Sequence, residues 1–385
     1  MNDVPDNPQW HGILLDPLDV LFFRDGRPFD AANRVLSGSP APQTVAGAIR
    51  TALLAATGFS FSRIKGHHGS VVEHLRKAGA DEAILAAEFR GPWFATKNRS
   101  GQPSEYTPVF ACPMNLRRMK NDPNRWLIGR PRNINDNPVP GWRHPDGLWP
   151  IEYSDDPDPK ADPVLLTLTG LKKYLSADKS CARLDMQNGA DSIDIDSLFG
   201  MDHRVGIGID PSRLATIKGE LYGIGLMALK PGVMLYLEAK LPQRLVSYFH
   251  EQPNGSLAVP IGGEGKYAKA TVTAPCDFPK SDRERKRSLR YLATPTFLRD
   301  RASQSRPLPP ASFGTLLAGA SDRGQAISGW DISRGGPRKT RFVVPAGAVY
   351  FFEGAGGDDG LIEESEERSA LLQEGWGFSI QGAWS

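Results

Sequence analysis

The chain has 385 residues, and its 46 Lys and Arg residues nearly balance 44 Asp and Glu, which gives a formal net charge of +2. Hydrophobic residues make up 40% and charged residues 23%, as in an ordinary globular protein with a substantial core. No run of about 18 apolar residues is present, which excludes a transmembrane helix, and the N-terminus lacks a signal-peptide pattern. At this length we expect two or more domains, or one domain with large insertions.

Three widely separated cysteines, Cys112, Cys181 and Cys276, indicate a reducing, intracellular location, and we expect a cytoplasmic protein. They do not form a metal-binding pattern, and no histidine stands at a recognised ligand spacing from a carboxylate or cysteine. No P-loop is present either. We therefore expect no metal and no cofactor.

The chain opens with a strand over 11–15 and a second apolar run over 20–23, followed by Arg24-Asp25-Gly26-Arg27-Pro28. Asp-Gly favours a tight turn and Pro28 cannot donate to a sheet ladder. Arg24 and Arg27 are thus expected on a stiff loop beside a buried strand. A helix follows from Thr44, its expected N-cap, to Thr57, with Arg50 on the side opposite the core.

Helices are expected over 71–75, 81–88 and within 165–177, with Pro- and Asn-rich loops between 98 and 163. Residues 202–210 then alternate as a strand, and further strands are expected over 220–229, 233–239 and 268–273. A helix over 242–250 and a glycine-rich loop over 261–267 lie between the last two strands.

The C-terminal part repeats this plan. It is expected to contain a strand over 290–296, a helix over 312–320, a strand over 348–353, a helix over 363–373 and a last strand near Gly382. Each half then has the order β-α-β-β-α-β, which is the ferredoxin-like order. The prediction is an α+β protein of tandem ferredoxin-like (RRM-like) domains, 1–280 and 281–385, with an insertion at about 58–218 in the first.

Basic residues are grouped in three places. The clusters are Arg117, Arg118, Lys120, Arg125, Arg130 and Arg132; Arg283, Arg285, Lys286, Arg287 and Arg290; and Arg334, Arg338, Lys339 and Arg341. Acidic stretches lie at 155–162 and 363–367. Segregated charge of this kind suits a polyanion on one face and a protein partner on another, although any one run also suits a solvated loop.

Ferredoxin-like sheets commonly bind single-stranded RNA, with Lys and Arg contacting phosphates. Arg24, Arg27, Arg50, Arg204 and Lys266 all fall near expected loop or helix ends of the first domain. Glycine loops allow a ligand to approach the backbone closely.

Two stretches resemble a known family. Residues 17–29 resemble the N-terminal signature of the third subunit of the Cmr complex, the type III-B CRISPR RNA-guided effector, and 203–210 with 219–222 resemble its central element. Residues 261–265 and 375–377 are similar to glycine-rich loops of the wider RAMP superfamily. The loop at Gly263 lacks a third glycine, and nothing in 58–200 matches a family motif.

The resemblance implies a non-catalytic subunit that grips the 5′ repeat-derived tag of the CRISPR RNA. Its implied partners are the large cyclase-polymerase subunit and the backbone RAMP subunits, with a thumb-like hairpin near 202–217 reaching over the guide. The implied RNA-binding residues are Arg24, Arg27, Arg50, His203, Arg204, Gly263, Gly265 and Lys266.

Two alternatives remain open. The chain could be a metal-independent endoribonuclease that processes CRISPR RNA with His203 as its base, assisted by Lys266. It could instead be a purely structural subunit whose basic clusters face acidic partners.

Overall fold

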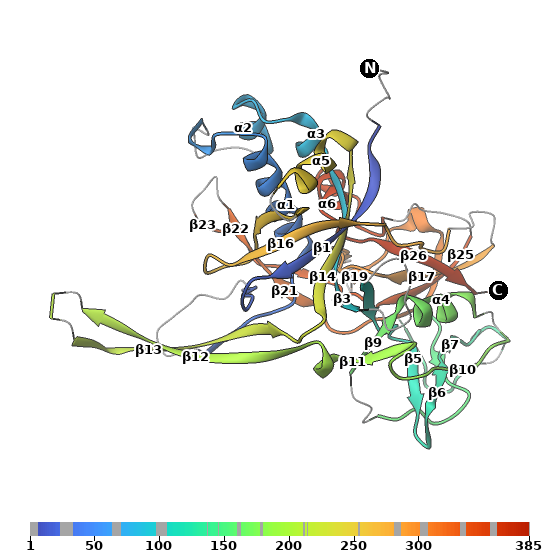
Figure 1. The fold of residues 1–385 in the computed structure, drawn as a ribbon. Coiled ribbons are helices and arrows are strands. Elements are labelled where there is room, and N and C mark those ends of the chain that lie inside the picture. Colours follow the sequence, from blue (N-terminus) through green and yellow to red (C-terminus); the bar gives the residue numbers. More distant parts are fainter. Residues whose placement is uncertain are drawn as a thin grey trace. The chain divides into compact units, whose positions relative to one another are not determined.

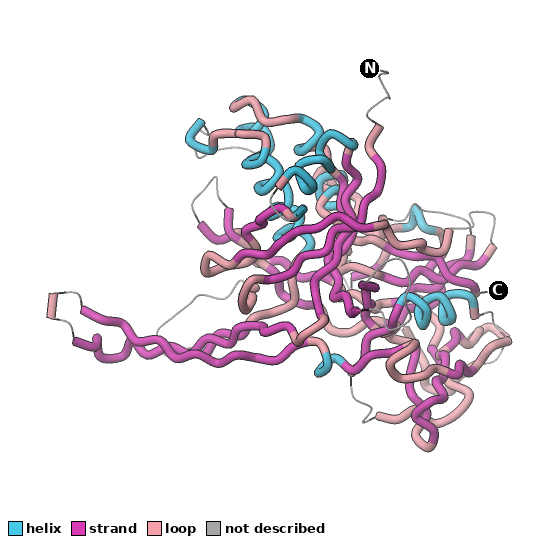
Figure 2. The backbone as a smooth tube through the Cα atoms, in the orientation of Figure 1, coloured by secondary structure: helices cyan, strands magenta, loops and turns pink. Residues whose placement is uncertain are grey.

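The computed structural model describes residues 7–23, 34–63, 71–97, 106–136, 138–144, 146–159, 163–177, 180–210, 212–213, 215–252, 255–280, 286–300, 307–331, 336–354 and 360–384. It is an α+β protein, as expected, and contains more strand than helix (Figure 2). The chain forms two compact units. Unit 1 consists of Met1–Pro92, Leu198–Pro275 and Ala326–Arg341, and unit 2 of Trp93–Ser197, Cys276–Gln325 and Phe342–Ser385. The domain boundary between 280 and 281 stays a prediction.

Unit 1 is built on an antiparallel sheet with β1 at its centre. Five neighbouring strands of this eight-stranded sheet are, in spatial order, β3 (Glu88–Lys97), β14 (Val233–Leu241), β1 (Gln9–Pro17), β16 (Tyr267–Thr273) and β15 (Leu257–Pro260). Ile13 of β1 stands opposite Leu237 of β14 and Val272 of β16. Alternating side chains of these strands are fully buried on one face, against which α1 (Pro42–Ala56) and α5 (Gln243–Glu251) pack. The strands expected over 11–15, 233–239 and 268–273 therefore lie side by side in this sheet.

The helices of unit 1 begin and end near their predicted positions, with two corrections. Thr44 is not the N-cap of α1, because its amide already donates to Ala41 O at 3.0 Å; Ala41 caps the helix and Pro42 opens it. The helix expected over 81–88 is a single turn, α3 (Glu82–Leu85), since the chain enters β3 at Glu88. Other helical segments here are η1 (Phe61–Arg63) and α2 (Val71–Lys77).

A long β-hairpin extends from unit 1 (yellow-green in Figure 1). Its arms are β12 (Phe199–Asp210) and β13 (Ala215–Leu229), paired antiparallel from Phe199 opposite Leu229 to Asp210 opposite Ala215. The short strand β2 (Arg34–Leu36) runs parallel to β13 near the base. The stretch 202–217, expected to be thumb-like, lies within this hairpin, and the strand expected over 220–229 is part of its second arm.

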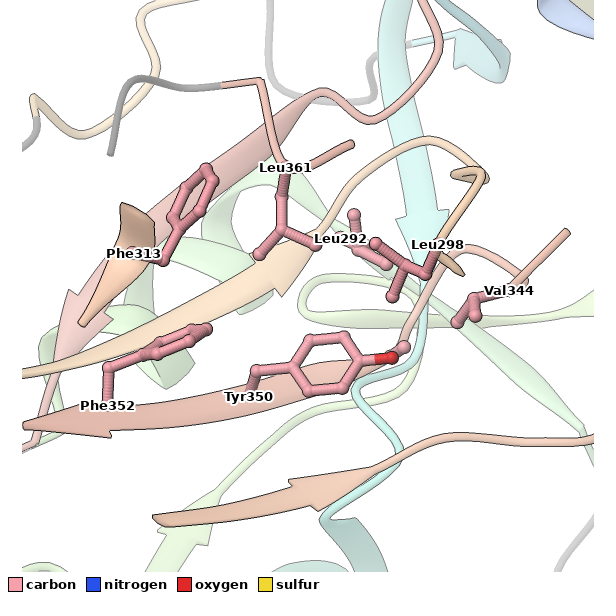
Figure 3. Packing of buried hydrophobic residues seen from close by; sticks show 8 residues of the cluster. Leu292, Leu298, Phe313, Val344, Tyr350, Phe352 and Leu361 are labelled. Carbon is pink, nitrogen blue, oxygen red and sulfur yellow. The ribbon is translucent and has the colours of Figure 1, made fainter. Parts of the chain in front are cut away.

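Unit 2 contains a second antiparallel sheet. Its strands, in spatial order, are β20 (Thr315–Ala320), β25 (Val349–Glu353), β17 (Arg287–Leu292) and β26 (Ser379–Ala383). A cluster of buried side chains covers one face of it, with Leu292, Tyr350 and Phe352 from the strands and Phe313 and Leu361 from the flanking segments (Figure 3). Two helices of this unit are α4 (Leu168–Ser176), which contacts β26, and the short α6 (Arg368–Gln373).

The helix predicted over 312–320 is wrong. Only Ala311–Phe313 forms one helical turn (η4), and Thr315–Ala320 is strand β20, paired with β25. Gly314 separates the two with a φ of +105°, and a side chain there would meet Glu353 O at 2.6 Å. Gly319 lies beneath the ring of Tyr350, so this close approach of strands favours sheet over helix.

The remaining elements are short strands and turns. They are β4 (Tyr106–Ala111), β5 (Leu116–Met119), β6 (Asp122–Ile128), β7 (Arg130–Pro131), β8 (Ile151–Glu152), β9 (Val164–Thr167), β10 (Arg183–Asp185), β11 (Ser192–Asp194), η2 (Ile195–Ser197), β18 (Arg299–Asp300), β19 (Pro307–Leu308), β21 (Gln325–Ile327), β22 (Trp330–Asp331), β23 (Gly336–Pro337) and β24 (Arg341–Val343). Within the described part of the chain, every helix is too short or too polar to span a lipid bilayer.

Candidate nucleic-acid interface

The glycine-rich loop between β15 and β16 closes tightly against the segment after β1. Ile261 N donates to Lys266 O at 2.9 Å, and Gly263 N donates to Phe22 O at 2.8 Å. Gly262 has a φ of +74°, and a Cβ at this position would lie 2.5 Å from Phe22 O. Glycine is therefore required at 262 by both the backbone conformation and the close approach.

The tip of this loop also adopts left-handed backbone. Gly265 has a φ of +62°. Glu264 has a φ of +59° and, among the described residues, is the single non-glycine residue with a positive φ. A Cβ in this region costs about 1 kcal/mol. Glu264 thus holds a left-handed position that glycine would occupy without strain, and both residues are exposed.

Lys266, at the end of the loop, forms an ion pair with Asp19. Its Nζ lies 2.8 Å from Asp19 Oδ2; the lysine side chain is 16% exposed and the aspartate side chain 55%. The hydrogen bond from Lys266, aided by Val20 N and by the charge of Arg204, holds the pKa of Asp19 below its usual range. The loop and the base of the hairpin therefore share one electrostatic neighbourhood.

Arg204 stands on the face of β12 that turns toward Phe22. It is opposite Ile224 in the hairpin register, and Ile224 packs against the buried cluster of Phe22, Val35 and Leu226. Its guanidinium donates to Asp202 Oδ2 at 2.8 and 2.9 Å and remains half exposed.

His203 faces the other side of the hairpin, because successive strand residues alternate faces. It is opposite Gly225, where an added Cβ would lie 3.2 Å from His203 Nδ1 and 2.6 Å from Leu36 Cδ2. The same face continues outward with Val205, 72% exposed, and Ile207, 49% exposed. The hairpin therefore presents an apolar, solvent-exposed surface beyond its base.

Arg50 is used inside unit 1. Its Nη2 donates to Ala87 O at 2.8 Å, and its guanidinium lies 5.0 Å from the centroid of the Phe89 ring. These contacts join α1 to the start of β3. These two contacts of Arg50 lie within unit 1, and its role in RNA binding stays a prediction.

Some described members of two basic clusters make contacts within the protein. In the first, Arg118 pairs with Asp194 at 3.3 Å, and Arg130 donates to Ala177 O at 2.9 Å. In the second, Arg290 is 2% exposed and Arg287 pairs with Glu353 at 3.2 Å. These four arginines, Arg118, Arg130, Arg287 and Arg290, therefore contribute to packing within unit 2.

The structure brings together Arg204, Gly263, Gly265 and Lys266 and adds Asp19, which sequence reasoning missed. Asp19 and Lys266 are 247 residues apart in the sequence, so no local sequence pattern could predict their ion pair. Arg24 and Arg27 lie outside the described residues. Among the described residues, no group of three or more His, Cys, Asp or Glu side chains could hold a metal ion.

Comparison with known proteins identifies the family. The model of the family CRISPR-associated protein (Cas_Cmr3) matches residues 13–384, so the chain belongs to this family. This is the family of the third Cmr subunit, and the chain is accordingly a subunit of a CRISPR type III effector. No curated protein sequence matches the chain.

A solved structure with a TM-score of 0.50 shows the same fold at low identity. A chain of the type III-B Cmr-beta complex bound to cognate target RNA is 16% identical with a TM-score of 0.50, covering 88% of this chain and 86% of that one. The complex that also contains AMPPnP gives a TM-score of 0.49 with the same identity and coverage. A chain of the Csm1-Csm4 cassette in complex with pppApA is 11% identical with a TM-score of 0.36, covering 90% and 88%.

Proposed function

We propose that this chain is a non-catalytic subunit that grips the 5′ repeat-derived tag of the CRISPR RNA in a type III-B effector. The observation that carries the proposal is the convergence of Lys266 and Arg204 at the glycine loop, where the exposed hairpin begins. Cations on a close-approach loop suit the phosphates of a fixed RNA segment, while the guide supplies sequence specificity by base pairing.

We also propose that the hairpin lies over the RNA, and its exposed side chains support this. Its apolar side chains, Val205 and Ile207, are exposed where a solvated strand would normally be polar. Apolar side chains of this kind contact bases and sugars rather than phosphates. We therefore assign the hairpin to lie over the RNA and the glycine loop to hold its backbone.

The proposed partners are the large cyclase-polymerase subunit and the backbone RAMP subunits of the same complex. Family membership supports this assignment, and the similar Cmr-beta chains come from a complex bound to target RNA. Bridging these partners would make the chain part of an antiviral ribonucleoprotein.

We also propose that the two units carry tandem ferredoxin-like sheets. In unit 1 the order β3-β14-β1-β16 supports this, with β1 antiparallel to both neighbours. In unit 2 the order β20-β25-β17-β26 follows the same scheme, except that a strand directly follows the turn where the first helix was expected.

The non-catalytic part of the proposal rests on the hairpin's two faces. A ribonuclease built on His203 and Lys266 would need both side chains on one scissile phosphate. Arg204, which acts electrostatically with Lys266 on Asp19, lies on one face, and His203 lies on the opposite one. This separation favours RNA binding over cleavage.

The test compares an RNA whose 5′ repeat tag is unpaired with the same RNA in which a complementary strand covers the tag. The full chain should bind the RNA with the unpaired tag more tightly, and Arg204→Ala combined with Lys266→Met should weaken that binding. Equal binding of both RNAs by the wild-type chain would contradict a site for the unpaired tag, and absence of binding would contradict the RNA-binding role.

A further inference from the structure

The third basic cluster of the sequence lies on a two-stranded ribbon of unit 1, formed by 326–331 and 336–341. Within it β22 and β23 pair antiparallel, and Arg338 N continues the ladder by donating to Gly329 O at 2.7 Å. The charged residues of these two ranges are three basic residues and one acidic residue, namely Arg338, Lys339, Arg341 and Asp331. The ribbon therefore carries an excess of positive charge.

The ribbon is anchored to the N-terminal end of α1 by an uncharged side chain. Gln43 Nε2 donates to Ser328 O at 3.2 Å, and Arg338 Nη1 donates to Gln43 Oε1 at 3.5 Å. Because Gln43 carries no charge, this contact holds the guanidinium in place without neutralising it. Arg338 and Lys339 are both exposed, and neither forms an ion pair with a carboxylate among the described residues. Both positive charges are thus available to an anion in solution.

The anchor of the ribbon is connected through the backbone to the glycine loop. Gly263 N donates to Phe22 O, and Gly38 N donates to Phe23 O, each at 2.8 Å. The chain from Gly38 to Gln43 then spans at most about 18 Å even when fully extended. A short single strand that leaves the glycine loop can therefore reach the ribbon within unit 1.

The segment that makes this connection, 34–44, contains no Asp or Glu. Gly38 and Ser39 within it are exposed. The first turn of α1, where the segment ends, also lacks an acidic residue. A polyanion that follows this segment therefore meets none of its carboxylates before it reaches the uncancelled charges of the ribbon.

We infer that Arg338 and Lys339 bind two backbone phosphates of the RNA strand whose tag the glycine loop holds. The inference rests on the proposed RNA-binding function and adds to it a second phosphate site on another part of unit 1. These contacts would contribute affinity and position the strand without reading its bases. An acidic protein surface is the competing occupant. RNA is favoured because one polyanionic strand can contact both the loop and the ribbon along a segment free of acidic residues.

The experiment measures the affinity of the full chain for an RNA with an unpaired 5′ tag and adjoining guide at four salt concentrations. Lys339→Gln should weaken binding about threefold and make the slope of log affinity against log salt shallower by about 0.7. Arg338→Gln combined with Lys339→Gln should weaken binding about tenfold and change the slope by about 1.4. Lys339→Gln alone leaves the contacts of Gln43 intact, so its effect cannot arise from release of the ribbon.

Lys77→Gln is the matched control, because Lys77 is an exposed lysine on α2 of the same unit. It should leave both affinity and slope unchanged. A second measurement replaces the RNA phosphates one at a time with neutral methylphosphonates. One or two replacements should weaken binding by the wild type and have no effect on the double variant, a coupling that a merely structural role of the ribbon would not produce.

The inference is overturned if the double variant keeps wild-type affinity and slope while Lys266→Met lowers both. RNA would then contact the glycine loop alone, as expected if the ribbon binds an acidic protein. Failure of the wild type to bind any RNA would instead overturn the proposed function itself.

Discussion

Lys266 Nζ lies 2.8 Å from Asp19 Oδ2 and ties the glycine loop to the segment that leaves β1. The pair has a functional consequence, since the cation closest to the loop backbone already has a counter-charge. RNA phosphate must compete with, or bind alongside, the half-exposed carboxylate of Asp19.

Replacing Asp19 with Asn should therefore strengthen RNA binding. The freed ammonium can neutralise one phosphate, so affinity should rise about threefold near physiological salt and the slope of log affinity against log salt should steepen by about 0.7. Lys266→Met should do the opposite and make the slope shallower. Titrations of each variant with tagged RNA at four salt concentrations measure both effects. An unchanged slope in both variants would show that Lys266 does not contact RNA.

The ion pair should also withstand mild acid. Because the pKa of Asp19 is lowered in the folded chain, its stabilising contribution is complete above the carboxylate's ordinary pKa and is lost only as pH falls through the lower folded value. The difference in RNA affinity between wild type and Asp19→Asn should accordingly stay constant between pH 7.5 and pH 5.5. A difference that shrinks across this range would contradict the assigned pairing.

Alanine substitutions at two glycines of the loop distinguish the cost of left-handed backbone from the added cost of a steric clash. Gly265→Ala adds a Cβ at a left-handed position with no neighbouring atom within 4 Å and should cost about 1 kcal/mol of unfolding free energy. Gly262→Ala adds the same strain plus an approach of 2.5 Å to Phe22 O. It should cost at least about 1 kcal/mol more than Gly265→Ala, measured by urea unfolding. Equal losses would mean that the loop does not press on Phe22.

Arg50 is predicted to act on stability rather than on RNA. Arg50→Met keeps the aliphatic stem but loses the hydrogen bond to Ala87 O and the contact with Phe89, and should lower the unfolding free energy by about 1–2 kcal/mol. RNA affinity at a temperature where the variant is folded should match the wild type. Lys77→Met, on α2 of the same unit, is the control for loss of one positive charge. Weakened RNA binding without loss of stability would restore Arg50 as a contact residue.

His203→Ala should not change the length of a precursor RNA incubated with the full chain. The reason is the placement of His203 and Arg204 on opposite faces of β12, which separates the histidine from the loop cations. Denaturing gels of reactions with and without a chelator make the measurement. Chelator-resistant cleavage by the wild type that disappears in His203→Ala would establish an endoribonuclease.

Much of the fold follows from local pattern. The alternation of Val205, Ile207 and Ile209 predicts a strand, and the observed β12 contains them. The run from Tyr267 to Ala270 alternates exposed and buried residues in the same way, as predicted for this strand. The helix predicted over 312–320 fails because close packing at Gly314 and Gly319 is a tertiary constraint that helix propensity does not contain.

The candidate site was less accessible to sequence reasoning. Lys266 and Arg204 were identified from motifs, but their common partner Asp19 depends on a contact between distant segments. The family resemblance implies an RNA contact for Arg50, on the first helix of the same face as the tag loop. The carbonyl of Ala87, which it actually contacts, is supplied by another element.

The most direct test of the account is ultraviolet crosslinking of the full chain to RNA with a free 5′ tag, followed by mass-spectrometric mapping of the crosslinked peptides. The account predicts crosslinks in peptides that contain Arg204 and in peptides that span Gly263 to Tyr267, with loss of the latter when a complementary strand covers the tag. Crosslinks confined to 117–132 or 286–290, independent of the tag, would contradict it and place the RNA on another surface.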